Sequence, residues 1–161
     1  MKNDAMNAQL LPLRENWTVA RFKIQYSLSH TGIFVNSSDD AYRIFYAMWD
    51  HSLINLQEQA NALYLNMKDE VIGFRNICTG TANGIHIDTT MLMTCALLSK
   101  SRRVILAHNH PNGYPHPSKA DFHTTRELHK VLGLLNINLI DHLIITEKEH
   151  FSFADSTSIL T

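Results

Sequence analysis

Residues 106–122 read L-A-H-N-H-P-N-G-Y-P-H-P-S-K-A-D-F, and this stretch determines which fold and which chemistry the sequence predicts. His108 and His110 stand two positions apart on a segment expected to be extended, so their side chains point the same way. A carboxylate from the next element, Asp121, can supply a third metal ligand. Three such nitrogen and oxygen ligands leave the fourth position of a tetrahedral zinc ion open for water, which is typical of hydrolytic sites. A closed structural zinc site uses four protein ligands instead.

The surrounding sequence predicts a strand, a loop and a helix in that order. Residues 104–107 form a short apolar run that is consistent with a buried strand. Three prolines and a glycine then interrupt residues 111–117, which favours a loop. Ser118 stands where a helix N-cap belongs, and Asp121, three residues later, completes a capping box with Asp in place of Glu. The first turn of this helix should therefore aim Asp121 at the strand end that carries the histidines.

The motif resembles the JAMM metal motif of the JAB (MPN+) superfamily of zinc metallopeptidases. Within that superfamily it is similar to the RadC family, whose motif reads H-N-H-P-S-G-x-P-x-P-S-x-x-D. The asparagine between the histidines favours RadC over the deubiquitinase branch, which usually has Ser or Thr there. D-H-L-I-I at residues 141–145 resembles the D-H-x-I-I of the family, and G-T-A-N at residues 80–83 resembles its G-T-L-N. The resemblance covers roughly residues 40–160.

Three features depart from the family pattern. Asn112 replaces a serine of the motif, and Ile87-Asp88-Thr89 replaces the usual Pro-Arg-Glu near the start of the central helix. The short N-terminus offers no counterpart of the helix-hairpin-helix segment that precedes the domain in longer RadC proteins. We therefore expect a short form of the family, in which any role of the Arg-Glu pair is in doubt.

The resemblance implies a complete set of site residues. One zinc ion per chain would be held by His108, His110 and Asp121. Glu58 would be the general base, because residues 58–66 match the spacing of the family's E-H-F-x-V-L-x-L-N. Ser118 would donate a hydrogen bond to the oxyanion of the tetrahedral intermediate.

Each of these roles has a plainer alternative. Asp121 can be a first-turn acid that complements the helix dipole, an effect of at most about 1 kcal/mol. Ser118 can be a helix cap, worth on the order of 1 kcal/mol. Glu58 can be a solvated acid at the start of a strand, and the competing acid Glu70 falls in a turn, where we expect it to be solvated.

The other histidines carry weaker signals. His116 lies in the loop of the motif, while His123 and His129 lie off the Asp121 face of the motif helix, so we expect all three to be exposed. His142 follows Asp141 on an apolar strand. It can orient a metal ligand, but a core histidine with satisfied hydrogen bonds is the commoner outcome.

Hydrophobic periodicity predicts a sequence of mixed elements. Residues 1–37 would be a leader with a first strand at 18–27, and residues 38–161 a RadC-like JAB/MPN domain. Within that domain we expect helices at 38–49, 88–100 and 118–132, the last ended by Gly133 as its C-cap. Strands should fall at 59–66, 70–78, 104–107, 137–146 and 150–153. This order argues for an α+β fold of three-layer α/β/α type, a curved mixed sheet flanked by helices, and the resemblance implies the same cytidine deaminase-like arrangement.

Composition narrows the class of protein further. A chain of 161 residues with 45% hydrophobic and 18% charged residues suits one globular domain. A net charge of −1 provides no electrostatic footprint for nucleic acid. Cys78 and Cys95 form no metal or redox motif and read as reduced thiols, which favours the cytoplasm. We expect no membrane span and no secretory signal.

The leading hypothesis is a zinc-dependent hydrolase of peptide or isopeptide amide bonds in an unidentified peptide or protein substrate. A DNA-repair accessory protein is the second hypothesis, against which the neutral charge and the missing helix-hairpin-helix segment count. An inactive metal-bound or metal-free scaffold is the third, and the intact ligands and the candidate base count against it. A basic groove would favour the second, and a metal site without a nearby glutamate would favour the third. The sequence does not indicate an oligomeric state.

Overall fold

A computed structural model describes residues 31–81 and 84–161. The described elements, in chain order, are α1 (Ser38–Met48), β1 (Gln59–Leu65), β2 (Val71–Thr79), α2 (Thr89–Leu98), β3 (Arg103–Asn109), α3 (Lys119–Leu134), β4 (Asn138–Ile145), β5 (His150–Ser152) and α4 (Phe153–Ser156). Apart from α4, which the sequence does not predict, these bounds agree with the predicted elements to within a few residues. The strand predicted at 18–27 lies outside the described residues, and the division of the chain at residue 37 stays a prediction.

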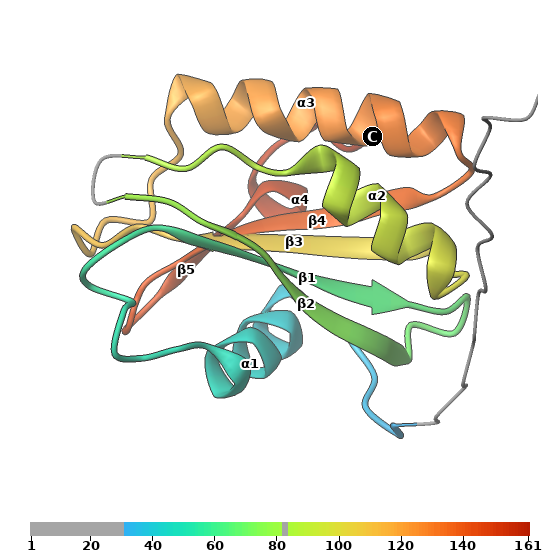
Figure 1. Cartoon of the computed structure of the whole chain (residues 1–161), viewed down its shortest axis with the longest axis horizontal. Helices are drawn as coiled ribbons and strands as arrows, with labels where there is room; N and C mark the ends of the chain where they lie inside the picture. Colours follow the sequence, from blue (N-terminus) through green and yellow to red (C-terminus); the bar gives the residue numbers. More distant parts are fainter. Residues whose placement is uncertain (1–30, 82–83) are drawn as a thin grey trace, which may run out of the picture.

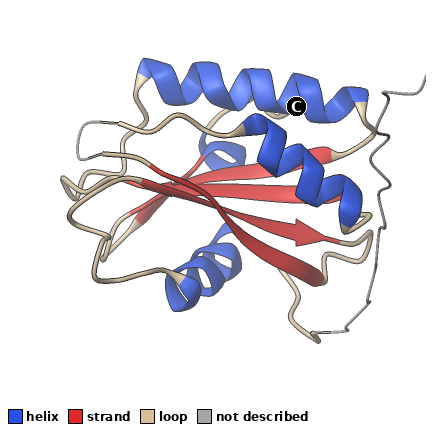
Figure 2. Cartoon of the chain, in the orientation of Figure 1, coloured by secondary structure: helices blue, strands red, loops and turns tan. Residues whose placement is uncertain are grey.

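The described strands form one mixed sheet in the order β2-β1-β3-β4-β5. Strands β3 and β4 are parallel, while the pairs β1–β2, β1–β3 and β4–β5 are antiparallel. Helix α1 covers one face of this sheet, and α2 and α3 cover the other (Figures 1 and 2). The predicted three-layer α+β fold with a mixed sheet is therefore confirmed.

Strand β1 shows why the sheet needs helices on both faces. All seven of its residues are buried. Ala60, Ala62 and Tyr64 belong to the apolar cluster on the α2–α3 face, whereas Leu63 and Leu65 belong to the cluster under α1. Because neither set of alternating side chains meets water, this strand is apolar apart from Gln59 and Asn61.

The same alternation along β3 delivers the motif histidine to the α3 face. Leu106 packs in the cluster on the α2–α3 face and Ala107 in the cluster under α1. Continuing the alternation puts His108 on the α3 face and Asn109 on the α1 face. The neighbouring residues His108 and Asn109 therefore point to opposite faces of the sheet.

The predicted capping box of α3 is present. The Ser118 Oγ accepts a hydrogen bond from the Asp121 backbone N–H at 3.2 Å, and the Asp121 carboxylate accepts one from the Ser118 N–H at 2.7 Å. Thr125, Leu128 and Leu132 follow on the same helix face and are buried. Burial of that face fixes the rotation of α3 about its axis, so that Asp121 is turned toward the sheet.

Two residue predictions are wrong in this part of the fold. Gly133 is not a C-cap, because α3 continues to Leu134, and the left-handed residue that follows the helix is Asn136, with φ of 54°. Glu70 is not solvated: it is 6% exposed, and its carboxylate accepts hydrogen bonds from the Gly32 N–H and the Asn66 side-chain amide. The cause is tertiary, since the segment before α1 packs against the β1–β2 turn and covers it.

Two predictions based on composition can also be compared with the structure. Cys78 and Cys95 are free, as expected for reduced thiols. None of the described helices combines the length and apolar character that crossing a membrane requires.

Candidate metal centre

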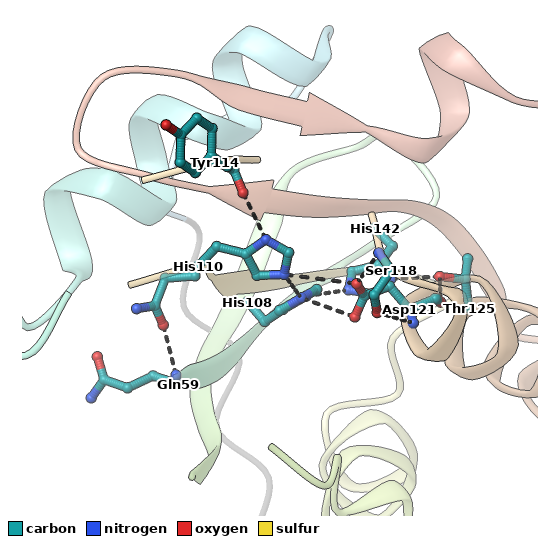
Figure 3. Close-up of polar contacts among 9 residues, drawn as sticks. Gln59, His108, His110, Tyr114, Ser118, Asp121, Thr125 and His142 are labelled. Carbon is teal, nitrogen blue, oxygen red and sulfur yellow. Dashed lines mark hydrogen bonds and ion pairs between the residues drawn. The ribbon is translucent and has the colours of Figure 1, made fainter. Parts of the chain in front are cut away.

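His108, His110 and Asp121 converge on one point, as the sequence predicts. The Nε2 atoms of the two histidines lie 3.1 Å apart. The Oδ1 atom of Asp121 lies 3.2 Å from the His108 Nε2, and its Oδ2 lies 3.7 Å from the His110 Nε2 (Figure 3). One ligand atom from each residue fits within 4.8 Å of the other two.

Backbone structure at the end of β3 holds His110 in place. Its N–H donates to the Ile145 carbonyl of β4 at 3.1 Å, which extends the parallel pairing by one residue. The chain then turns, with the Gly113 N–H bonded to the His110 carbonyl. Gly113 has φ of 78°, a conformation that glycine adopts without a steric cost. This turn brings the Tyr114 carbonyl to 2.8 Å from the His110 Nδ1.

The contact with Tyr114 determines which nitrogen of His110 is free. A carbonyl oxygen can only accept, so the His110 Nδ1 carries the hydrogen and donates it. In the neutral ring the Nε2 then has an unshared electron pair, and this atom faces His108 and Asp121 (Figure 3). Neutral imidazole with a free Nε2 is the form that binds metals.

His142 lies directly behind His108. Its Nε2 is 2.8 Å from the His108 Nδ1, and its Nδ1 is 2.7 Å from the Thr125 Oγ1. It is 1% exposed, and this burial lowers the pKa of His142 well below its ordinary value. His142 is therefore a buried core histidine with both ring nitrogens paired, as expected, and it also touches a candidate metal ligand.

Asp121 is ionised although it is largely withdrawn from water. Burial by itself would raise the pKa of this carboxyl, but the neighbouring His108 ring and the hydrogen bonds at Ser118 lower it well below the ordinary 3.8. A carboxylate is thus available to a cation at neutral pH.

Glu58 and Ser118 line the same cavity as the three ligands, a space of about 330 Å³ whose wall also includes Ile85 and Ile87. Glu58 lies immediately before β1, where burial raises its pKa against the opposing charge of the two histidines. Ser118 lies at the mouth of the cavity, at the N-terminus of α3. Their assigned roles, general base and oxyanion donor, stay predictions.

Asn109 is a residue whose function sequence reasoning missed. It is fully buried, and its Oδ1 accepts from the Gln59 N–H at 2.6 Å. Its amide group donates to the carbonyls of Ile54 and Gln57, at 2.7 and 3.0 Å. These three partners flank Glu58, so Asn109 fixes the segment that carries the candidate base. The asparagine of H-N-H was the available signal, but the spacing could not show what its side chain binds.

The predictions for the other histidines are confirmed only in part. His116 and His123 are exposed as expected, whereas the prediction for His129 is wrong, since this residue is half-buried and its Nδ1 is shielded from solvent. Asp88, in the place of the arginine of Pro-Arg-Glu, caps α2 by accepting from the Met91 N–H at 2.8 Å.

The donor set fits a zinc ion. Bonds of 2.0–2.1 Å at tetrahedral angles put ligand atoms about 3.3 Å apart. The separations of 3.1 Å between the two Nε2 atoms and 3.2 Å between the His108 Nε2 and the Asp121 Oδ1 lie close to that value. Two imidazole nitrogens and one carboxylate oxygen also match the ligand preferences of zinc. The fourth side of the site faces the cavity.

A mixed sheet between helices, with an open His-His-Asp site at the end of its central parallel pair, defines a JAB-type domain. A family profile described as "RadC-like JAB domain" matches residues 35–158, and the chain belongs to this family.

Curated relatives agree with this assignment. A UPF0758 protein of Coxiella burnetii is 34% identical over 119 residues, which cover 74% of this chain and 52% of that protein. The UPF0758 protein YeeS of Escherichia coli is 39% identical over 99 residues, 62% of this chain and 67% of that protein. A UPF0758 protein of Halorhodospira halophila is 38% identical over 98 residues, 61% of this chain and 44% of that protein. The chain thus spans between about half and two thirds of the length of the relatives it matches.

Proposed function

We propose that this RadC-like domain is a zinc-dependent hydrolase of peptide or isopeptide amide bonds. The observation that carries the proposal is that three ligand atoms and a glutamate with a raised pKa share one open cavity. When bound by His108, His110 and Asp121, zinc would polarise a carbonyl and lower the pKa of a coordinated water to about 7.

Glu58 is the residue suited to move the proton. A general base works best when its pKa lies near the working pH, and burial shifts Glu58 in that direction. It would take a proton from the attacking water and pass it to the leaving amine. Its position on the cavity wall beside the ligands supports this role and counts against an inactive scaffold.

Ser118 is suited to stabilise developing negative charge. Its Oγ already accepts a hydrogen bond from the Asp121 N–H, so its own hydroxyl hydrogen is still available to donate. A donor aimed at an oxyanion contributes about 3 kcal/mol to transition-state stabilisation. Helix capping and oxyanion binding are therefore compatible uses of one hydroxyl group.

The first test is the zinc content of the purified protein, measured by elemental analysis. We expect about one zinc per chain in the wild type and little in a His108→Ala/Asp121→Ala double variant. No uptake of zinc by the wild type near neutral pH would overturn the proposal.

The second test is cleavage of an internally quenched peptide library by the zinc-loaded protein. Glu58→Gln should retain zinc but lose activity by a factor of about 10² to 10⁴. Glu147→Gln, at an exposed position in the turn after β4, is the matched control and should remain active. Zinc binding without any cleavage by the wild type would favour a metal-binding scaffold instead.

A further inference from the structure

The contacts behind His108 form a continuous chain of hydrogen bonds, from the Asp121 backbone through Thr125 and His142 to His108 (Figure 3). We propose that Thr125 and His142 are positioning residues that hold His108 in the tautomer whose Nε2 is free for the metal. The inference rests on the metal site of the proposed function, but not on its hydrolytic activity.

The first link determines the direction of the chain. The Thr125 Oγ1 lies 2.6 Å from the Asp121 carbonyl oxygen. Two oxygens approach this closely only with a hydrogen between them, and a carbonyl has none to give, so the Thr125 hydroxyl donates. With its hydrogen committed, the Thr125 Oγ1 can only accept from the His142 Nδ1, which lies 2.7 Å away. The His142 Nδ1 therefore carries a hydrogen.

The hydrogen bond between His142 and His108 is determined in the same way. His142 is 1% exposed, a burial that favours the neutral ring, and a neutral ring with a hydrogen on Nδ1 has none on Nε2. The His142 Nε2 must then accept from the His108 Nδ1 at 2.8 Å. The ring of Phe153 stacks on His142, with 5.1 Å between centroids and 11° between planes, and so restrains its rotation.

The result is that His108 holds a hydrogen on Nδ1 and presents Nε2 to the site. That Nε2 lies 3.1 Å from the His110 Nε2 and 3.2 Å from the Asp121 carboxylate. A metal ion and a proton compete for this single position. If the donors and acceptors in this series of hydrogen bonds were reversed, the His108 Nε2 would carry a hydrogen and could not bind the metal.

His110 obtains the same tautomer in a different way. Its Nδ1 donates to the Tyr114 carbonyl in its own loop, and this bond involves neither Thr125 nor His142. The tautomers of the two histidine ligands are therefore fixed independently. A backbone carbonyl in its own loop fixes His110, and side chains from α3 and β4 fix His108. A change at Thr125 should alter His108 alone, which makes His110 an internal control.

The test compares Thr125→Val, which keeps the side-chain shape but removes the hydroxyl, with Thr125→Ser, which keeps the hydroxyl. The first measurement is the ¹⁵N chemical shifts of the ring nitrogens in metal-free protein at mildly alkaline pH. Wild type and Thr125→Ser should show His108 with hydrogen on Nδ1. In Thr125→Val the His142 Nδ1 has lost its acceptor, so His108 should shift toward hydrogen on Nε2 while His110 does not change.

The second measurement is zinc affinity by competition with a chromogenic chelator. Thr125→Val should bind zinc about 10- to 100-fold more weakly than wild type, and Thr125→Ser close to wild type. If Thr125→Val does not fold, His142→Gln against His142→Leu supplies a second pair. The glutamine oxygen can still accept from the His108 Nδ1, so only the leucine variant should lose affinity.

The outcomes separate the two proposals. Unchanged ring shifts and unchanged zinc affinity in Thr125→Val, or equal affinity of the glutamine and leucine variants, would overturn the positioning role and leave the hydrolase intact. A wild type with hydrogen on the His108 Nδ1 that nevertheless binds no zinc would overturn the proposed function and leave the hydrogen-bond chain intact.

Discussion

Asp121 on α3 and Asp141 on β4 are two carboxylates largely withdrawn from solvent, yet their surroundings differ. Asp141 accepts hydrogen bonds from the His142 N–H, the Ala154 N–H and the Ser152 hydroxyl, at 2.7, 3.0 and 2.7 Å. Asp121 accepts one backbone hydrogen bond, from Ser118, and directs its remaining capacity at two histidine nitrogens beside a cavity.

The pKa values of the two groups move in opposite directions. Burial raises the pKa of Asp141, and its three hydrogen bonds offset this only in part. Burial also raises the pKa of Asp121, but the neighbouring His108 and Ser118 lower it by more. A carboxylate saturated by donors joins elements together, in this case β4, β5 and α4. A carboxylate with spare acceptor capacity facing open space is the one available to a ligand.

The largest expected effect is on metal binding. Asp121→Asn keeps the acceptor that caps α3 but loses the negative charge. We expect zinc affinity to fall by more than the roughly 100-fold that is lost when a residue hydrogen-bonded to a metal ligand is removed. The unfolding free energy of the metal-free protein should fall only by what the charge of Asp121 contributes, because the amide oxygen still caps α3. Chelator competition and urea denaturation measure the two quantities, and zinc affinity close to wild type would break the comparison.

The converse effect is expected at Asp141. Asp141→Ala leaves two backbone N–H groups and one hydroxyl without their acceptor, so the unfolding free energy should fall by on the order of 3 kcal/mol. The folded fraction should still bind zinc as wild type does. Glu147→Ala, at an exposed position in the turn after β4, is the control and should cost far less. A stable Asp141→Ala protein would mean that this carboxylate is not a structural tie.

Asn109 extends the comparison to the opposite face of β3. Asn109→Asp replaces two donated hydrogen bonds with an oxygen facing the carbonyls of Ile54 and Gln57. We expect a loss of about 2 kcal/mol in the unfolding free energy. Turnover should fall because Glu58 is displaced, while zinc affinity should remain unchanged. The exposed substitution Asn138→Asp serves as the reference. If zinc affinity fell together with turnover, Asn109 would also support the metal ligands and not Glu58 alone.

The smallest expected difference lies in the pH dependence of stability in the metal-free protein. The lowered pKa of Asp121 adds stability above its ordinary pKa of 3.8, and this is lost as the pH falls below that value. The raised pKa of Asp141 makes stability decline as the pH rises from 3.8 toward the folded-state pKa. Asp121→Asn should therefore abolish the part of the unfolding free energy that increases with rising pH. Asp141→Asn should abolish the part that decreases with rising pH. Urea denaturation across a pH series checks the two signs, and equal signs would refute the contrast.

Much of the site followed from sequence because its parts are local. The spacing of His108 and His110 fixes a common direction on any extended segment, and the capping box orients Asp121 within one helical turn. The apolar periods of the strands and of α3 likewise predicted the order of elements and the three layers. Glu70 was misjudged because a neighbouring segment covers it, and Gly133 because α3 continues one residue past it and the left-handed conformation falls on Asn136 instead.

The sequence by itself thus determined which residues can bind a metal, since ligand type and local spacing are properties of the chain. Only the tertiary structure decided how those residues are held. Thr125 and His142 are 17 positions apart, and Asn109 lies 50 positions from Gln59. A single hydrogen bond leaves no periodic trace in a sequence, because its partner is chosen by the pairing of strands and the docking of α3, which join residues that no local pattern connects.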